Sequence, residues 1–283
     1  MKRPPLGPVI ATHHARTPRR KADQNRNLMR ITVPTSLPLP TSDDRTAWKQ
    51  LGYLAVPGLF RREAIAEVER LLDALLMEKI ASGPDDWTQL RDDDRATSVE
   101  ILGTAQLEPR LMASEVFQLC EIYAANLLGM PMEFVFDHVI RKTAGIGAGT
   151  RWHQDTYYEK GEPYRNTHRV HFWIPMADVP LMGGAMRYIP GTHGGKNFEH
   201  QIIPGKADTH YVMATGFDES AAMDVPIACG GAILHHPRLL HGSGPNTSDQ
   251  QRTAWILQFA TPRTLTQKLR YRSKGWIKAI SRA

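Results

Sequence analysis

The segment Arg151-Trp152-His153-Gln154-Asp155 places an imidazole and a carboxylate two positions apart, just before the tyrosines Tyr157 and Tyr158. Residues two apart on a β-strand project from the same face, so His153 and Asp155 can bind one metal ion if a strand carries both. An isolated His-X-Asp pair is also an ordinary surface feature. Its meaning therefore depends on residues elsewhere in the chain.

Two downstream residues give the pair a chemical context. His241 follows an apolar, strand-like run and a turn, and Arg252 comes 11 residues later at the start of another apolar run. Two histidines and one carboxylate form the facial triad that binds Fe(II) and leaves positions open for a cosubstrate and O₂. An arginine on the next strand can bind the far carboxylate of a 2-oxo acid through paired hydrogen bonds. His153, Asp155 and His241 are therefore the candidate metal ligands.

The elements that must position these residues follow from apolar periodicity. Apolar residues at helical spacing predict helices over 62–80 and 114–128, the second closed by Gly129 and Pro131. Residues 81–110 are polar, and the run of three aspartates at 92–94 within them is typical of a solvated loop.

Beyond Pro131 the apolar period changes to two, and short β-rich runs are separated by glycine and proline. Strands that follow helices in this way predict a mainly β fold, an antiparallel sandwich or jelly roll with flanking helices. The expected domain covers 41–283, with its helices at about 62–128 and its β core at about 133–260. The predicted strands are 133–141, 149–153, 168–176, 184–190, 223–228, 231–235 and 252–260.

The charge distribution argues against a nucleic-acid partner although the net charge is +6. Residues 1–40 carry eight basic residues against one acidic, and 263–283 carry seven against none. The chain's 35 basic and 29 acidic residues thus leave 20 basic and 28 acidic residues in 41–262. Residues 1–40 also hold seven prolines and no periodic pattern, which predicts a disordered or loosely packed basic extension.

Cysteine usage and hydropathy indicate the cellular compartment in which the protein is expected. Cys120 and Cys229 show neither a disulfide framework nor metal-binding spacing, which favours a reduced, cytoplasmic setting. No apolar run approaches the roughly 18 residues expected of a transmembrane helix. We expect a protein without a membrane span, and its oligomeric state stays open.

From about 133 to 260 the motifs resemble the phytanoyl-CoA dioxygenase family of Fe(II)/2-oxoglutarate oxygenases. That family has a double-stranded β-helix fold, a jelly-roll, cupin-like barrel, which agrees with the predicted strands. The matching residues, in order, are Trp152-His153-Gln154-Asp155, Trp173, Gly184, Pro190-Gly191-Thr192-His193, His241-Gly242-Ser243, Asn246, Ser248 and Arg252.

The resemblance implies roles for individual residues. His153, Asp155 and His241 would bind iron, and Arg252 would bind the distal carboxylate of 2-oxoglutarate. Other implied or candidate contacts are Ser243, Trp173 and His138 for the cosubstrate, and Arg151, Tyr157, Tyr158 and Arg187 for the substrate. The family often has Lys-Pro-Pro where this chain has Lys142-Thr143-Ala144, so contacts in that loop are expected to differ.

The implied cofactors are Fe(II), 2-oxoglutarate and O₂. The expected activity is oxidation of an unactivated C–H bond of a small molecule, by hydroxylation, desaturation or cyclisation, in specialised metabolism or catabolism. An acyl-CoA or lipid hydroxylase is the alternative among enzymes. A non-catalytic, cupin-type metal-binding protein is the alternative of another class.

Overall fold

The computed structural model describes residues 38–82, 88–92, 95–158, 168–202 and 212–264. Contacts divide the chain into Met1–Leu37 and Pro38–Ala283, and the fold described below belongs to the second unit. The predicted basic extension over 1–40 lies outside the described residues except for 38–40 and stays a prediction.

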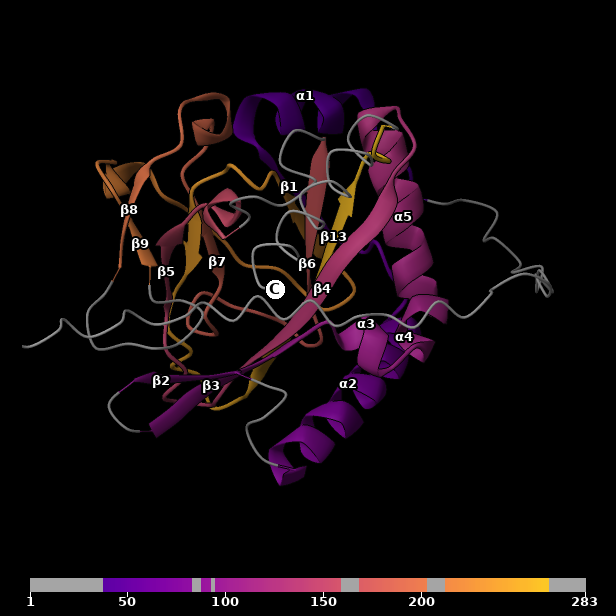
Figure 1. Ribbon diagram of the computed structural model, residues 1–283, viewed down its shortest axis with the longest axis vertical. Helices are drawn as coiled ribbons and strands as arrows, with labels where there is room; N and C mark the ends of the chain where they lie inside the picture. The colour runs from indigo at the N-terminus through magenta and orange to yellow at the C-terminus, as the bar shows by residue number, and fades with distance from the viewer. Residues whose placement is uncertain (1–37, 83–87, 93–94, 159–167, 203–211, 265–283) are drawn as a thin grey trace, which may run out of the picture. The chain divides into compact units, whose positions relative to one another are not determined.

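Helices occupy the N-terminal half of this unit (Figure 1). The two predicted helices are confirmed as α2 (Arg62–Ser82) and α5 (Glu115–Leu128). Two single-turn helices, α3 (Thr104–Leu107) and α4 (Arg110–Ala113), lie between them.

The first helix, α1 (Ser42–Leu51), was not predicted. Thr41 and Asp44 cap its start reciprocally, each side chain accepting a hydrogen bond from the other's backbone N–H. Its end is at Gly52, whose φ of 80° is readily adopted by glycine.

Each predicted strand contains an observed strand, and every pairing is antiparallel. The larger sheet has seven strands, in the order β1 (Tyr53–Val56), β11 (Ala232–His235), β6 (Arg169–Pro175), β13 (Arg252–Ala260), β4 (Glu133–Lys142), β3 (Arg95–Leu102) and β2 (Thr88–Asp92). The smaller sheet has four, in the order β10 (Met223–Val225), β7 (Met186–Tyr188), β12 (His241–Ser243) and β5 (Thr150–His153). A separate hairpin pairs β8 (Glu199–Ile202) with β9 (Val212–Thr215).

Asp92 of the aspartate run that was predicted to be a solvated loop ends a strand, β2, and Asp93 and Asp94 lie outside the described residues. β2 and β3 form a hairpin that extends the larger sheet beside β4, while 83–87 and 93–94 lie outside the described residues. The extension follows from cross-strand pairing with β4, which a sequence pattern of polar residues does not reveal.

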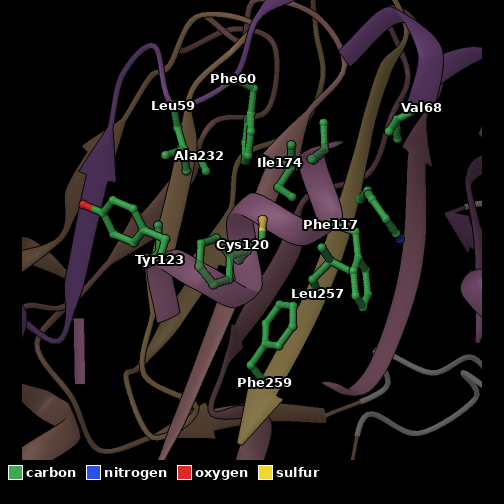
Figure 2. Packing of buried hydrophobic residues seen from close by; sticks show 14 of the residues in the cluster. Leu59, Phe60, Val68, Phe117, Cys120, Tyr123, Ile174, Ala232, Leu257 and Phe259 are labelled. Atoms are coloured by element: carbon green, nitrogen blue, oxygen red, sulfur yellow. The ribbon is translucent and has the colours of Figure 1, made fainter. Parts of the chain in front are cut away.

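Central strands of the larger sheet are buried on both faces. Phe172 and Ile174 of β6 join a core with α2 and α5, whereas Trp173 between them joins a core against the smaller sheet. Figure 2 shows the helix-side core, where Phe117 and Cys120 of α5 lie against the sheet. Alternation on each strand therefore separates a helix-side core from the space between the sheets, where the chemistry-bearing residues lie.

Asp137 ties a helix to two strands. Its Oδ2 accepts hydrogen bonds from the Ala105 backbone N–H at 2.9 Å, from Trp255 Nε1 at 2.8 Å and from the Thr104 hydroxyl. Burial raises the pKa of the Asp137 carboxyl, although these donors oppose the shift. One buried carboxylate thus joins α3, β4 and β13.

No helix in the described part of the chain has the length and apolarity to cross a membrane.

Asp137→Ala should lower the free energy of unfolding by about 3 kcal/mol, because it leaves buried donors without an acceptor. Urea unfolding followed by circular dichroism measures the loss. Asp43→Ala, at an exposed position of α1, is the control and should change stability by less than about 0.5 kcal/mol. Equal stabilities of the two variants would contradict this role for Asp137.

Candidate metal centre

Two paired strands of the smaller sheet bring the candidate histidines together. His153 at the end of β5 lies directly opposite His241 at the start of β12. Asp155 Oδ1 lies 3.4 Å from His153 Nε2 and 3.6 Å from His241 Nε2. Bonds of about 2.1 Å to one transition-metal ion separate neighbouring ligands by about 3.0–3.4 Å, so the spacing suits a shared ion.

Backbone carbonyls orient both imidazoles. His153 Nδ1 donates to Arg151 O and His241 Nδ1 donates to Leu239 O, each at 2.8 Å. A carbonyl only accepts, so each Nε2 of the neutral rings carries a lone pair. Burial lowers the pKa of His241 well below its usual value, which keeps that ring neutral.

Both Nε2 atoms therefore face the same carboxylate oxygen, Asp155 Oδ1. With the ring hydrogens on the two Nδ1 atoms, three acceptor atoms meet there, and a cation among them would remove their mutual repulsion. All three side chains are largely buried, so bulk water offers little screening. The donor set fits a divalent metal ion. That these residues bind iron stays a prediction.

The explanation that one strand presents both His153 and Asp155 was wrong. β5 ends at His153, and Asp155 begins a 3-10 helix, η2 (Asp155–Tyr157). Gln154 between them is fully buried, donates from Nε2 to Arg238 O at 2.5 Å, and accepts from the Phe198 N–H at 2.8 Å. The anchored glutamine fixes the turn that carries the carboxylate back toward the imidazoles.

Two further histidines contact Asp155. His171 Nδ1 lies 2.7 Å and His235 Nε2 lies 3.3 Å from Asp155 Oδ2. Both rings are buried, and burial lowers the pKa of His171 to about 3. The sequence analysis did not assign either residue to the site. The signal available for His171 was its position two residues before Trp173, on the same face of a strand.

Two cations lie on the larger sheet, where Arg252 of β13 pairs with Lys142 of β4. Lys142 Nζ donates to Ser243 Oγ and to Gly244 O, each at 2.8 Å. Burial lowers the pKa of the Lys142 ammonium well below its usual value, and the charge of Arg252 adds to the shift. Lys142 was not predicted as a site residue, although it matches the lysine of the family's Lys-Pro-Pro motif, and its contact with Ser243 shows where it lies.

The Arg252 guanidinium is also buried. It lies 5.1 Å from the centre of the Trp173 ring, donates to Gly184 O at 3.3 Å, and has no acceptor for Nε. Burial lowers the pKa of Arg252 to about 9. In the part of the chain that the structure describes, no carboxylate forms an ion pair with Arg252 or Lys142.

The predicted contact His138 lies on β4, two strands from β6 on the larger sheet. Its Nδ1 is 2.5 Å from Glu100 Oε1 of β3. Burial disfavours the charged ring, but the hydrogen bond and charge of Glu100 outweigh it, so the pKa of His138 is raised. The structure thus places an imidazole–carboxylate pair on the inner face of the sheet.

Of the candidate substrate residues, Tyr157 and Tyr158 contact histidine rings, whereas the side chain of Arg151 is exposed. Tyr158 lies closest to the triad, its ring 5.7 Å from that of His153, while Tyr157 stacks on His200 at 4.6 Å. Arg151 is exposed and contributes its carbonyl to His153.

Arg187, another candidate substrate residue, lies on the side of β7 away from the triad, and its contact with the substrate stays a prediction. It projects from the face of β7 opposite to Tyr188 and forms ion pairs with Asp224 and Glu219. Its guanidinium lies 5.2 Å from the centre of the Trp152 ring. Alternation along β7 therefore turns this side chain away from the triad.

Residues 48–254, most of the chain, match the family described as "Phytanoyl-CoA dioxygenase (PhyH)". The chain belongs to the phytanoyl-CoA dioxygenase family. It is an Fe(II)- and 2-oxoglutarate-dependent dioxygenase, with iron and 2-oxoglutarate as its cofactors.

Curated relatives are distant in sequence. A probable alpha-ketoglutarate-dependent hypophosphite dioxygenase of Stutzerimonas stutzeri is 23% identical over 221 residues, 74% of each chain. The peroxisomal phytanoyl-CoA dioxygenase of Mus musculus is 23% identical over 244 residues, 78% of this chain and 68% of that protein.

Solved structures confirm the predicted double-stranded β-helix. EvdO2 from Micromonospora carbonacea var. aurantiaca superimposes with a TM-score of 0.69 at 26% identity, covering 81% of this chain and 95% of EvdO2. EctD from S. alaskensis, solved with 2-oxoglutarate and 5-hydroxyectoine, gives a TM-score of 0.61 at 18% identity, over 78% and 76% of the two chains. At that identity the second likeness concerns the fold alone.

Asp155→Ala should weaken Fe(II) binding at least tenfold, because it removes the carboxylate that faces the two Nε2 atoms. Anaerobic Fe(II) titration measures the affinity. Arg187→Ala is the control and should bind Fe(II) as the wild type does, because Arg187 faces away from the triad. Wild-type affinity in Asp155→Ala would remove Asp155 from the ligand set.

Proposed function

We propose that His153, Asp155 and His241 hold the iron, and that the enzyme oxidises an unactivated C–H bond of a small, polar molecule. In the hydroxylation form, R–H, 2-oxoglutarate and O₂ give R–OH, succinate and CO₂. The observation that carries the proposal is the convergence of two imidazole lone pairs and one carboxylate oxygen in a buried site. Iron supplies the activation of O₂ and the oxidative decarboxylation of the cosubstrate.

Two buried cations without an anion support a dianionic cosubstrate. Burying a charge is costly unless an opposite charge compensates it, and the charge of Arg252 adds to the cost of charging Lys142. A distal carboxylate that accepts from both would lift this penalty. Ser243, which already accepts from Lys142, would donate its own hydroxyl proton to the same carboxylate.

The distance between the two ends fits the cosubstrate. His241 and Ser243 are two residues apart on β12, which places them on one face and about 6.6–6.8 Å apart along the strand. 2-Oxoglutarate spans about this distance between its 2-oxo end and its distal carboxylate. We therefore infer that it lies along β12, with its 2-oxo end beside His241 and its distal end beside Ser243 and Lys142.

The neighbouring residues would orient this ligand and exclude water. Trp173 holds the Arg252 guanidinium against its ring, so the donors that remain face the space beside β12. The two sheets bury Trp173, Ser243 and both cations, which strengthens every electrostatic contact to a bound carboxylate.

Polar residues beside the triad favour a polar substrate. Arg169 precedes His171 by two residues on β6, so both lie on the inner face, and it donates to Gln258 Oε1 at 2.8 Å. The His138–Glu100 pair lies on the same face of the sheet. These groups suit a substrate with several hydrogen-bonding atoms better than an acyl chain. They and the two cations also argue against a purely metal-binding barrel.

Relatives are consistent with this substrate class. The name of the Stutzerimonas stutzeri protein specifies hypophosphite, which is small and polar. The name of the mouse relative specifies an acyl-CoA, so the acyl-CoA alternative is included in the substrate screen. A cytoplasmic location and the lack of a nucleic-acid partner remain predictions.

Succinate formation tests the activity. Purified protein loaded with Fe(II) is supplied with 2-oxoglutarate and O₂ and screened against polar metabolites and acyl-CoA thioesters. The proposal expects substrate-stimulated succinate release, with a product heavier by one oxygen atom or lighter by two hydrogens. Stimulation by acyl-CoA alone would support the lipid alternative. Iron binding without cosubstrate binding would support the non-catalytic alternative.

Arg252→Met should raise the Kd for 2-oxoglutarate by at least about 30-fold, which corresponds to about 2 kcal/mol. Lys142→Met should raise it by about tenfold or more, because each variant leaves one cation for the carboxylate. The charge-transfer absorbance of 2-oxoglutarate bound to Fe(II), titrated without O₂, reports the Kd, and Fe(II) affinity should be retained.

Arg141→Met is the matched control for Lys142→Met. Arg141 precedes Lys142 on β4 but projects from the opposite face, where it pairs with Asp73 and donates to Thr253. A second check uses 2-oxopentanoate, which replaces the distal carboxylate by a methyl group. The wild type should prefer 2-oxoglutarate strongly, and the preference should shrink in both cation variants. An unchanged preference would remove the cations from this role.

A further inference from the structure

The two oxygens of Asp155 have different surroundings. Oδ1 faces the Nε2 atoms of His153 and His241, whereas Oδ2 faces Nδ1 of His171 and Nε2 of His235. One carboxylate thus separates two pairs of imidazoles. The first pair presents lone pairs, as shown by its bonds to backbone carbonyls.

The second pair can present hydrogens instead. Tyr188 Oη lies 3.3 Å from His235 Nδ1, and burial raises the pKa of Tyr188 well above its usual value, so the phenol keeps its proton. A phenol that donates to Nδ1 leaves the hydrogen of a neutral ring on Nε2, directed at Asp155. His171, whose Nε2 has no partner, donates from Nδ1.

The fold places these two donors side by side. His235 of β11 and His171 of β6 are direct partners across neighbouring strands of the larger sheet. Directly opposed residues project from the same face with their Cβ atoms about 5 Å apart. The larger sheet therefore presents two imidazoles to a carboxylate that belongs to a turn after the smaller sheet.

Asp155, His171 and His235 also form a geometrically compatible metal-ligand group. Their closest contact argues for a hydrogen bond instead. The 2.7 Å between His171 Nδ1 and Asp155 Oδ2 is the length of a charge-assisted hydrogen bond, whereas Oδ1 stands 3.4 and 3.6 Å from its two imidazoles. One of the two contacts at Oδ2 is thus too short to hold an ion between its atoms, whereas both contacts at Oδ1 have the spacing that an ion needs.

We propose that His171 and His235 are positioning residues that hold Oδ2 of Asp155 away from the iron, so that the carboxylate binds through Oδ1 alone. The inference rests on the proposed iron ligands. A carboxylate that binds through both oxygens would occupy a position that the cosubstrate or O₂ requires. Two donors on Oδ2 keep that position open and fix the carboxylate's orientation.

The test uses the different nitrogens that the two histidines employ. The amide of asparagine lies near the position of histidine Nδ1, and that of glutamine lies near Nε2. His171→Asn should therefore retain the donor to Asp155 and His171→Gln should misplace it. At His235 the order should reverse, with His235→Gln retaining the donor and His235→Asn losing it.

Anaerobic Fe(II) titration is the first measurement. Each misplacing variant should lose about 10- to 100-fold in affinity, while its retaining partner stays within about threefold of the wild type. The second measurement is the absorption spectrum of bound Co(II), which responds to coordination number. It should change in the two misplacing variants and stay as in the wild type in the other two. Circular dichroism of the metal-free variants confirms that all four are folded.

The opposite rankings cannot arise from side-chain volume, which changes in the same order at both positions. Equal affinities of Asn and Gln at each position would overturn the proposal, and so would two Co(II) ions bound per wild-type chain. Fe(II) binding also distinguishes failure of the proposed function from failure of this inference. If the proposed function fails, the wild type itself, or Asp155→Ala, would show no triad-dependent Fe(II) binding, whatever the variants of His171 and His235 do.

Discussion

The space between the two sheets contains buried charged side chains whose charges are incompletely compensated, and the rest of the site depends on them. At one end, a carboxylate oxygen of Asp155 faces imidazole lone pairs. At the other, Lys142 and Arg252 lie together, and no carboxylate among the described residues forms an ion pair with them. An arrangement of this kind costs stability in the free protein. The helix-side core, which α2, α5 and the sheet form on the opposite face, offsets this cost through its buried apolar surface.

Antiparallel strand pairing brings residues that are far apart in the sequence together in one site. Pairing of β5 with β12 opposes His153 and His241, which are 88 positions apart in the sequence. Pairing of β4 with β13 does the same for the two cations. Alternation then turns every second residue inward, so His171 and Trp173 share a face that Phe172 does not. The chemistry depends on register, because a shift of one residue would turn these side chains outward.

The sequence predicted the elements whose patterns are local, and the residues with a known motif. α2, α5 and the apolar strands have clear periods, and the triad and Arg252 have motif spacing. The capping pair Thr41 and Asp44 is a local sequence signal for the start of α1. The signals for Lys142, at the lysine of the family's Lys-Pro-Pro position, and for His171, two residues before Trp173, are weaker, because both residues act through contacts with distant strands. The 3-10 turn at Asp155 was missed because it depends on the buried side chain of Gln154.

The hydrogen bond from Lys142 to Ser243 joins β4 of the larger sheet to β12 of the smaller one. The proposed metal ligands lie on strands of the smaller sheet or just after one, whereas both cations belong to the larger sheet. A cosubstrate that reaches from the ligands to the cations would therefore bridge the two halves of the barrel, as a cross-link does. Since such a ligand binds only the folded chain, its concentration would set how firmly the sheets stay together. The empty barrel would then open more readily than the loaded one, and the supply of a central metabolite would control the lifetime of the fold.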